Sequence, residues 1–582
     1  MLLVTTSHPR TCRADSKILL LGEWCRRAVS PRIRTDIRVV PYHWDDRAAL
    51  EKDFRYLDTL HERWLPHLAD RLNAVHGTGH PVAYWRLVAG FWFKLCATVL
   101  YDRFRSLEEA AAHGPGLRTL ALLTGNDDLV AHNIADFVDR VTLSDLWNHH
   151  CYLALAEHMD GFAIEPLGGA HPGSSEVAPS ENRHAVRAAL RRAAVRVSQF
   201  ATRRNRIAAI SIYVPPRAAV ALAWHLGEVP LLGVPPIPVR GGPLRSDLRQ
   251  ALSIAGDTPF ERSFGALLPH LAPRSLVEDY GYLRDWALAA FPKRPRVILT
   301  TQFHVRNDAL CIWAAEKRLQ GADFRIVQHG GHYGVDRFES QEDHELRVAD
   351  RYYSWGWTRK GFGQITPMPA MQISGGRRFR TNPHGPLLFV YDTMPPYAYR
   401  LYCVPIASQG QWYASDQAEL IAALPEPLRA ASRLRLHPAS DAYHFPLRRT
   451  FSERGWAALI DEAREPLDSA LGRARLCVAT TNATVYLQTL ATNYPTLLYW
   501  NPRYNELRPE VKEDFKALAE AGILHYEPAS AARALAEAFG DVESWWASPA
   551  VQAARRRFVA RYARTAPDWA RLWARELKAG AP

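Results

Sequence analysis

The chain has 582 residues, of which 47% are hydrophobic and 23% charged. This length exceeds one ordinary core, so the composition favours two or three domains and excludes global disorder. The formal net charge of +12 suits nucleic acid, an anionic membrane surface or phosphorylated substrates, and an Arg-rich solvated surface is the plain alternative. Nucleic acid is disfavoured as a partner, because no Lys/Arg-rich run with interleaved aromatic residues stands out.

The cysteine pattern and the N-terminal residues bear on the cellular compartment in which the protein is expected. The seven cysteines are scattered and none forms a CxxC pair, so neither a disulfide framework nor a zinc site is expected. The first residues, MLLVTTSHPR, lack the apolar run of a signal peptide, and no apolar stretch is long enough to span a bilayer. We therefore expect a cytoplasmic protein whose basic surface could rest on the inner face of the membrane.

Apolar runs in chain order predict the elements. Helical spacing covers residues 49–73, 81–102, 130–159 and 308–319. Short continuous apolar runs predict strands at residues 17–21, 37–41, 207–214, 296–301, 324–328, 387–391, 434–437, 476–480 and 496–500. Such runs alternating with helices favour parallel sheets covered on both faces.

A break in this pattern predicts the domains. The segment GGRRFRTNPHGP at residues 375–386 resembles an interdomain linker, and residues 542–577 are largely helical. We expect an α/β fold of two Rossmann-like domains facing a cleft, in which ligands lie at the carboxyl ends of strands. The predicted parts are an acceptor-binding and catalytic domain with helical insertions, a nucleotide-donor domain, and C-terminal helices that cross back onto the first domain, at residues 1–380, 381–540 and 541–582.

In the first half, Asp45 and Asp46 stand beside His43 after a predicted strand. Asp45 is a candidate catalytic carboxylate, although a helix N-cap explains such residues equally well. The aromatic residues around Trp85 and Trp92 suit a sugar platform, but core packing is the commoner role at helical spacing.

A glycine-rich turn, QHGGHYG, follows the predicted strand at residues 324–328. Its glycines let the backbone bend sharply and approach a ligand. His329 and His332 could act there as acid or base or donate hydrogen bonds to phosphate, and a tight turn with structural histidines is the alternative. The acidic residues that follow, Glu342 among them, could supply a catalytic carboxylate.

Polar residues also follow strands of the second half. Arg435, His437 and Pro438 end one strand, where a cationic pair would suit a nucleotide phosphate. Another strand leads into a Thr-rich turn before a helix, where hydroxyl and N–H groups favour anion binding over an ordinary N-cap; its candidates are Thr480, Thr481, Asn482 and Thr484. After a further strand, Asn501 and Glu506 could hold ribose or sugar hydroxyls, or Glu506 could be a solvated helix residue.

The segments LLLGEWC, VVPYHWDDR, VQHGGHYG, YYSWGW, NATVYLQTL and LLYWNPRYNELR resemble, in collinear order from Leu20 to Arg508, a bacterial family of surface-carbohydrate-biosynthesis transferases. That family's pattern is similar to GT-B glycosyltransferases, especially those that use CMP-linked ulosonic acids such as Kdo or sialic acid. The resemblance implies that His437-Pro438 and Thr480-Thr481 grip a CMP moiety. Those GT-B enzymes usually carry an acidic catalytic motif that ends in Gly, whereas the glycine-rich turn here carries His329 and His332.

The resemblance implies a glycosyltransferase that moves a sugar from a nucleotide-sugar donor to a glycan or glycolipid acceptor of surface polysaccharide or lipopolysaccharide biosynthesis. The donor would be a co-substrate, with no metal and no other cofactor. The His-Gly turn is also similar to that of teichoic-acid glycerophosphotransferases, so polyol-phosphate transfer from a CDP-alcohol is an alternative. A non-catalytic scaffold of the same pathway is another.

Overall fold

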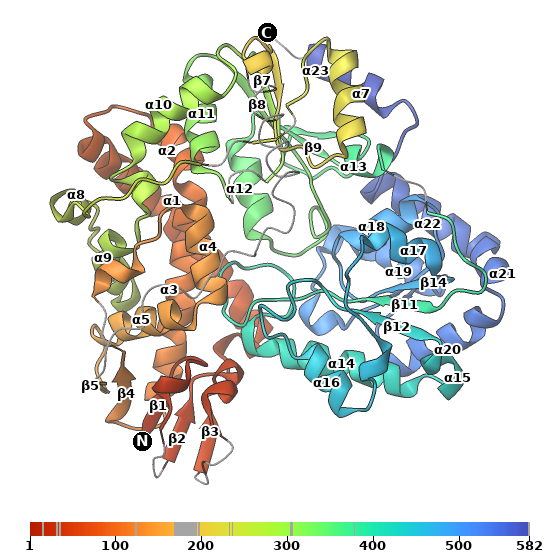
Figure 1. Cartoon of the computed structure of the whole chain (residues 1–582), viewed down its shortest axis with the longest axis horizontal. Coiled ribbons are helices and arrows are strands. Elements are labelled where there is room, and N and C mark those ends of the chain that lie inside the picture. The colour runs from red at the N-terminus through yellow and green to blue at the C-terminus, as the bar shows by residue number, and fades with distance from the viewer. Residues whose placement is uncertain are drawn as a thin grey trace.

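The structure is a computed structural model that describes the whole chain except residues 14–16, 31–32, 34–35, 123–124, 168–194, 196–197, 199, 232, 235–236, 303–305, 377–378 and 580–582. The described residues form three β-sheets in which neighbouring strands are parallel (Figure 1). The first has the order β3 (Asp36–Val39), β2 (Lys17–Leu20), β1 (Leu2–Val4), β4 (Leu117–Ala121), β5 (Phe162–Pro166).

The second sheet has the order β10 (Ile365–Pro367), β9 (Arg351–Ser354), β8 (Asp323–Val327), β7 (Val297–Thr300), β6 (Ile207–Ala209). The third has the order β13 (Ile460–Asp461), β12 (Ser432–Arg435), β11 (Leu387–Val390), β14 (Leu476–Ala479), β15 (Thr496–Tyr499), β16 (Leu524–His525). Numbered within its own sheet, the third runs 3-2-1-4-5-6, the strand order of the dinucleotide-binding Rossmann fold. The first sheet shares the 3-2-1-4-5 part of this order.

Helices cover the sheets and fill the space between the first two. Between the first and second sheets lie α1 (Arg47–His76), α2 (Val82–Val88), α3 (Gly90–Ala111), α4 (Ile134–Leu143), α5 (Asp145–Ala156), α9 (Pro259–Leu271), α10 (Tyr280–Ala290) and α11 (Asp308–Leu319), and α8 (Ser246–Gln250) lies at their outer margin. Around the second sheet lie α7 (Pro216–Leu226), α12 (Ser340–Val348), α13 (Met371–Ser374) and α23 (Trp569–Ala579).

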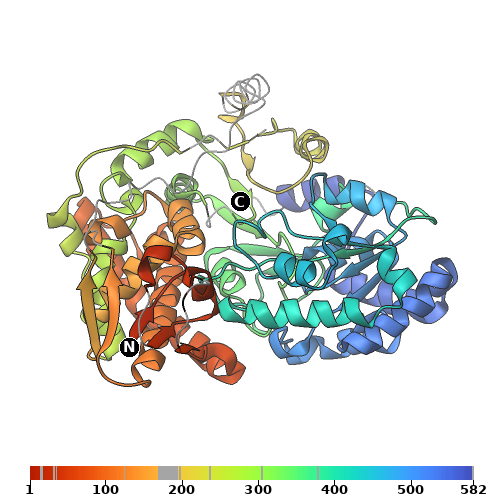
Figure 2. The ribbon, with the colours of Figure 1, turned by 60° about the horizontal axis from the view of Figure 1, so that its bottom comes forward.

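The third sheet and its helices form a separate lobe in both views (Figures 1 and 2). On one side lie α14 (Gly410–Ala423), α15 (Glu426–Ala430), α16 (Leu447–Glu453) and α20 (Pro528–Gly540). On the other lie α17 (Leu467–Arg473), α18 (Thr484–Ala491), α19 (Lys512–Glu520), α21 (Val542–Ala547) and α22 (Pro549–Tyr562). The strands are therefore covered on both faces, which their continuous apolar runs require.

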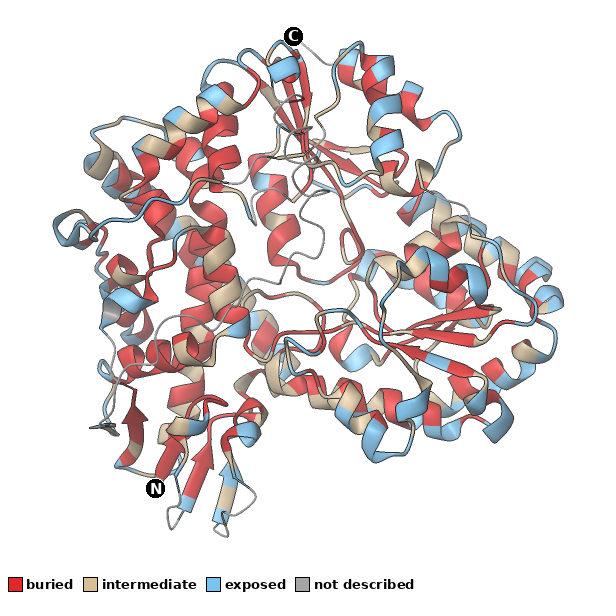
Figure 3. Cartoon of the chain, viewed as in Figure 1, coloured by how far each residue is buried: buried red, intermediate tan, exposed pale blue. Residues whose placement is uncertain are grey.

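Burial follows the apolar pattern, with buried residues along the sheets and the inner helix faces and exposed ones outside (Figure 3). Trp85 and Trp92 are buried in the core together with Tyr84, which confirms the core interpretation of these aromatic residues. None of the described helices is both long and apolar enough to cross a membrane.

The predicted α/β class and parallel sheets are confirmed, as is the returning C-terminal helix. Helix α23 packs against α7 and against Val297 and Tyr353 of the second sheet, and Trp573 Nε1 donates to Pro369 O at 2.8 Å. The expectation of two sheets was incomplete, because the first 166 residues contain a sheet of their own. The domain limits at residues 380 and 540 stay predictions; the third sheet extends from Leu387 to His525.

Candidate functional site

The candidate site lies where the third sheet reverses its strand order. Strands β11 and β14 are neighbours there, with Val390 paired to Ala479. Beyond their carboxyl ends stand Asp392 and the Thr-rich turn that begins at Thr480, whose hydroxyl donates to Val390 O at 2.9 Å. Ligands of open parallel sheets bind in the crevice at such a switch point. The strand order therefore marks this edge as the binding edge of the third sheet.

The glycine-rich turn after β8 docks onto the start of α18. Gly331 N donates to Thr484 Oγ1 at 3.1 Å, and His332 N donates to Asn482 O at 3.2 Å. A Cβ atom on Gly331 would lie 2.8 Å from Ala483 Cα and closer still to its carbonyl group, so only glycine permits this approach. The second and third sheets thus contribute one loop each to the same place.

Gln328 fixes the shape of this turn from within. Its Nε2 donates to Gly330 O at 2.8 Å, while its Oε1 accepts from Trp355 N at 2.9 Å and from Trp357 Nε1 at 2.8 Å. The side chain is buried, so these neutral hydrogen bonds are not weakened by exchange with water. The turn is therefore held rigidly before any ligand arrives.

His332 and Asp336 form a hydrogen-bonded dyad at the centre of the junction. His332 Nδ1 and Asp336 Oδ2 are 2.9 Å apart, and His332 has a φ of +70°, a conformation that costs a non-glycine residue about 1–2 kcal/mol. The buried Asp336 also accepts from Asn482 Nδ2 at 2.7 Å and from Cys403 N at 3.3 Å. A carboxylate held in this way fixes the orientation of the imidazole and stabilises its protonated form.

The charges around His332 favour its protonated state. Burial by itself lowers the pKa of the imidazole, but the Asp336 carboxylate outweighs that effect and Asp392 adds to it, so the pKa of His332 is raised above its ordinary value. Arg400 acts in the opposite sense. The His332 side chain remains 12% exposed, so a substrate can reach it.

A buried carboxyl group lies at the start of the adjoining α12. Burial raises the pKa of Glu339 to about 7, and Arg400 opposes that shift. Its side chain also caps the helix by accepting from Glu342 N. Arg400 in turn places its guanidinium 4.0 Å from the ring centroid of Tyr402, whose ring contacts His332 edge-on at 5.5 Å. These groups form the wall behind the dyad.

The catalytic roles of the other candidate residues stay predictions, and the structure gives their contacts within the protein. Glu342 is buried and binds Arg508 at 2.7 Å and Gly334 N at 2.6 Å, which ties α12 to the glycine-rich turn. The main chain of His329 accepts from Gln372 Nε2 at 2.7 Å, and its ring contacts Tyr213 at 6.2 Å between centroids. Asp45 lies in a contact between the first and third sheets, where it accepts from Gln409 Nε2 at 3.3 Å.

Most of the polar side chains of the Thr-rich turn are buried, and most are hydrogen-bonded within the protein. Thr480 bonds Tyr413 at 2.6 Å, Asn482 bonds Asp336 and accepts from Tyr486 at 2.8 Å, and Thr484 accepts from Gly331. Among the described residues, the Thr481 side chain has no hydrogen-bond partner. Thr481 is therefore the member of this turn whose hydroxyl is best able to serve a ligand.

The remaining predicted donor residues lie around the same lobe. Exposed His437 and Pro438 follow β12, and His437 Nδ1 accepts from Ala439 N at 3.1 Å. Arg435 is engaged by Asp461 at 2.9 Å, and Asn501 by Asp416 at 3.0 Å.

Glu506 takes part in a contact between the first part of the chain and the third-sheet lobe. Arg47 forms a bidentate ion pair with the Glu506 carboxylate, with N···O distances of 2.7 and 2.9 Å. The main-chain carbonyl of Glu506 accepts a hydrogen bond from Arg337 N at 2.9 Å. Glu506 thereby connects the start of α1 to the segment that follows the dyad. Its proposed contact with sugar would require this ion pair to open.

Sequence reasoning missed Asp336, Asp392 and Arg508. Asp392 could have been selected from the sequence, because it comes just after the apolar run of β11. The glycine-rich turn follows β8 in the same way. Asp336 follows His332 by four residues. This spacing predicts a side-chain contact only within a helix, and no helix is predicted there. Among the described residues, no group of three or more His, Cys, Asp or Glu side chains is placed to hold a metal ion.

Arg508 is expected to matter chiefly for stability. It donates through Nε to Asp336 O at 2.6 Å and through its terminal nitrogen to Glu342, all within the core. Arg508→Met would leave the buried Glu342 carboxylate with the hydrogen bond from Gly334 N and, as its charged partner, Arg359 at 3.3 Å, so we expect a loss of about 3–5 kcal/mol. Thermal unfolding followed by circular dichroism measures this. Arg533→Met, at an exposed arginine of α20, is the control; an equal change in Tm for both variants would contradict the assignment.

Comparison with known proteins gives one family and a distant structural likeness. A family model described as LIC12162 family transferase matches residues 1–577. Comparison with curated proteins finds no match. Among solved structures, the chain is similar to WaaG, described as a glycosyltransferase involved in lipopolysaccharide biosynthesis, with 12% identity and a TM-score of 0.31 over 64% of this chain and 100% of WaaG.

Proposed function

Because the chain belongs to the LIC12162 family of transferases, we propose that it is a glycosyltransferase that moves a sugar from a nucleotide donor, CMP-linked, to a hydroxyl group of a surface-polysaccharide or lipid-linked acceptor. The observation that carries the proposal is the junction itself. The switch point of a sheet with the Rossmann strand order faces a histidine–aspartate dyad supplied by the second sheet.

In this proposal the third sheet holds the donor. The Thr481 hydroxyl and the N–H groups that open α18 bind phosphate, where the helix dipole favours negative charge. His437 reaches the nucleotide from the end of the neighbouring strand β12. The charge that develops on the leaving phosphate is stabilised by these fixed donors, without a metal ion.

His332 acts as the general base on the acceptor. Its Nε2 takes the proton of the acceptor hydroxyl as the oxygen attacks the anomeric carbon. The bond between that carbon and the donor phosphate breaks, and the nucleotide leaves with the electron pair. Asp336 stabilises the imidazolium so formed, and a positioned base of this kind contributes about 10²–10⁴-fold in rate.

A thermal-shift screen against CMP, CDP, UDP, GDP and dTDP, with and without Mg²⁺, tests the donor site. A nucleotide at a hundred times its Kd should stabilise the folded protein by about 2.7 kcal/mol. We expect the CMP effect to be independent of Mg²⁺ and reduced in His437→Ala. His384→Ala is the matched control, since His384 is exposed just before β11, at the opposite end of the same sheet.

Each result of the screen has a consequence. Stabilisation by UDP, GDP or dTDP alone would discard the CMP assignment and retain the transferase. No response to any nucleotide would refute the donor site. A product joined by a new phosphodiester bond, in place of a new glycosidic bond, would indicate polyol-phosphate transfer.

A further inference from the structure

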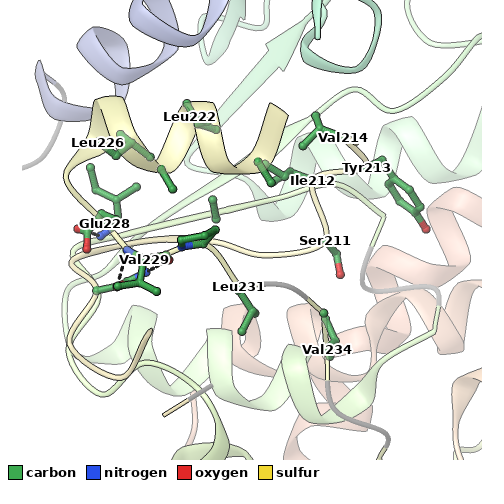
Figure 4. A pocket seen from close by; sticks show the side chains of 17 residues that line it. Ser211, Ile212, Tyr213, Val214, Leu222, Leu226, Glu228, Val229, Leu231 and Val234 are labelled. Atoms are coloured by element: carbon green, nitrogen blue, oxygen red, sulfur yellow. Dashed lines mark hydrogen bonds between the residues drawn. The ribbon is translucent and has the colours of Figure 1, made fainter. Parts of the chain in front are cut away.

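The two histidines of the glycine-rich turn have different neighbours. The ring of His329 contacts that of Tyr213, which lines a small pocket at the edge of the second sheet (Figure 4). The ring of His332 instead contacts that of Tyr402, in the segment of residues 392–403 that follows β11. We call this segment the dyad loop.

The dyad loop acts on the dyad through three of its groups. The N–H group of Cys403 donates to Asp336 Oδ2 at 3.3 Å. Two charged side chains of the loop act on the imidazole of His332, because Asp392 raises its pKa and Arg400 lowers it. The position of the loop therefore affects both the orientation of the dyad and the pKa of its histidine.

The middle of the dyad loop is anchored in the first part of the chain. Tyr397 Oη donates to Asp145 Oδ1 at 2.5 Å, and the Ala398 carbonyl accepts from Arg103 Nη1 at 2.7 Å. Both loop residues are buried. Residues 392–403 are all described by the structure and form neither a helix nor a strand, so the course of the loop depends on contacts of this kind.

The guanidinium of Arg103, in α3, is held in a single position. Its side chain is fully buried, with Nη1 2.6 Å from Asp102 Oδ2 and Nη2 2.7 Å from Asn148 Oδ1. Asp102 also accepts from Tyr42 Oη at 2.6 Å. The guanidinium lies 5.6 Å from the ring centroid of Tyr397. Helices α3 and α5 thus fix a charged donor that reaches the dyad loop.

A buried ion pair is not needed to hold α3 and α5 together. Well-packed apolar residues of similar volume often serve that purpose as well or better, because each buried charge loses its hydration. Apolar residues cannot supply a hydrogen bond to the Ala398 carbonyl, and a buried carbonyl without a partner is costly. The contact that distinguishes this ion pair is therefore the one to the dyad loop.

We infer that Arg103 is a positioning residue for the transfer reaction: it holds the Ala398 carbonyl and thereby fixes the dyad loop against His332 and Asp336. The inference rests on the proposed function, because it gives the loop a task in the chemistry of the dyad. Arg103 acts through the loop and contacts no reacting group itself.

The part of the dyad loop that depends on this anchor contains Asp392. The far end is held separately, because Ser340 N donates to Leu401 O at 3.0 Å and Leu401 N donates to Ser340 Oγ at 3.2 Å. Within the described part of the chain, the Asp392 carboxylate has one hydrogen-bond partner, Thr393 N at 2.8 Å, which belongs to the loop itself. Loss of the anchor should therefore displace Asp392 and weaken its effect on His332.

The double variant Asp102→Asn/Arg103→Met tests the inference, because it removes both buried charges together and leaves neither unpaired. We expect kcat to fall by about 10²-fold, since a displacement of about 1 Å at a reacting group has that cost in rate. The CMP thermal shift should stay unchanged, because the proposed phosphate-binding groups of α18 do not belong to the loop.

The matched control is Arg249→Met/Glu278→Gln. It removes another buried ion pair, with an N···O distance of 2.7 Å, from the same half of the chain. Arg249 also donates to main-chain carbonyls, those of Pro269 and Ala272, and neither belongs to the dyad loop. This variant should retain the kcat of the unmodified protein.

The titration of His332 supplies a readout that a merely structural role of Arg103 would not move. In protein labelled with [¹³Cε1]histidine, the NMR signal of His332 is the one that disappears in His332→Ala, and its titration gives the pKa without any substrate. We expect a lower pKa of His332 in the Asp102→Asn/Arg103→Met variant and an unchanged one in the control, because displacement of Asp392 removes negative charge from the surroundings of the imidazole.

Tyr397→Phe guards against misfolding of the double variant, because it removes only the hydrogen bond to Asp145 and keeps the ring. It should change kcat and the pKa of His332 in the same direction but by less. Values of both quantities equal to those of the control, in the double variant and in Tyr397→Phe, would overturn the inference.

The same measurements separate this inference from the proposed function. An unmoved titration of His332, in a protein that His332→Ala inactivates, removes only the role of Arg103. A shifted titration, in a protein that keeps full turnover as His332→Ala, refutes the proposed function and shows that the loop controls a histidine without catalytic use.

Discussion

Replacing His332 by alanine is expected to lower kcat by about 10²–10⁴-fold, with a much smaller change in the KM of the donor. The imidazole is part of the dyad, whereas the proposed donor groups belong to the third sheet. Steady-state kinetics with the nucleotide sugar selected by the thermal-shift screen measures both constants. A large rise in KM with unchanged kcat would assign His332 to donor binding instead.

His329→Ala is the internal comparison for this variant. Both histidines occupy one turn, but the carboxylate of Asp336 is bonded to His332. We expect His329→Ala to retain most of the turnover. If His329→Ala is the more damaging of the two, the roles of the histidines must be exchanged.

The pH profile distinguishes a base from a merely structural histidine. A general base works when unprotonated, so kcat/KM should rise with pH through the pKa of His332, which Asp336 raises above the ordinary histidine value. Asp336→Asn removes that negative charge and should move the acidic limb to lower pH. The maximum value of kcat/KM will also fall in this variant, because the orientation of the imidazole changes. The pH at which the acidic limb lies is therefore the informative quantity. An unmoved limb would exclude His332 as the titrating group.

Gly331→Ala is expected to abolish most of the activity and to lower Tm. The added methyl group would collide with the backbone of Ala483, and neither the turn nor the start of α18 can move without breaking the hydrogen bonds from Gly331 and His332. Overpacking of this kind costs about 1–3 kcal/mol, and a displacement of about 1 Å at a reacting group can cost about 10²-fold in rate.

Gly472→Ala provides the control for this substitution. Gly472 lies in α17 with nothing within 4 Å of the position of its Cβ, so alanine should be neutral or stabilising there by up to about 1 kcal/mol. Kinetics and thermal unfolding of both variants give the comparison. Full activity in Gly331→Ala would show that the close approach of the two loops is not needed for transfer.

Much of the site was visible in the sequence because its signals are local. A continuous apolar run followed by glycines or threonines needs only a few consecutive residues to be recognised, and this is how the turns after β8 and β14 were found. The same rule could have selected Asp392. It could not have selected Asp336, whose importance comes from its contact with Asn482, 146 residues away.

The first sheet shows where this reasoning fails. β1 has three residues at the very start of the chain, and β4 and β5 are separated by a long helical stretch, so no regular strand–helix alternation appears. Short strands contribute few residues to any periodic pattern. Their pairing through β1 joins segments that are far apart in the sequence, so no local pattern predicts it.

The sequence by itself determined the class of fold, the position of most strands in the second half, and which strand ends carry polar groups. These properties depend on hydrophobic spacing and on the conformational preferences of glycine, proline and threonine, which act over a few residues. Only the tertiary structure decided which of those polar groups meet. Arg435, Asn501 and Glu506 are engaged by Asp461, Asp416 and Arg47, while His332 is joined to Asp336 and the start of α18. The reason is that a side chain's role depends on partners supplied by packing between distant segments, and no local pattern records them.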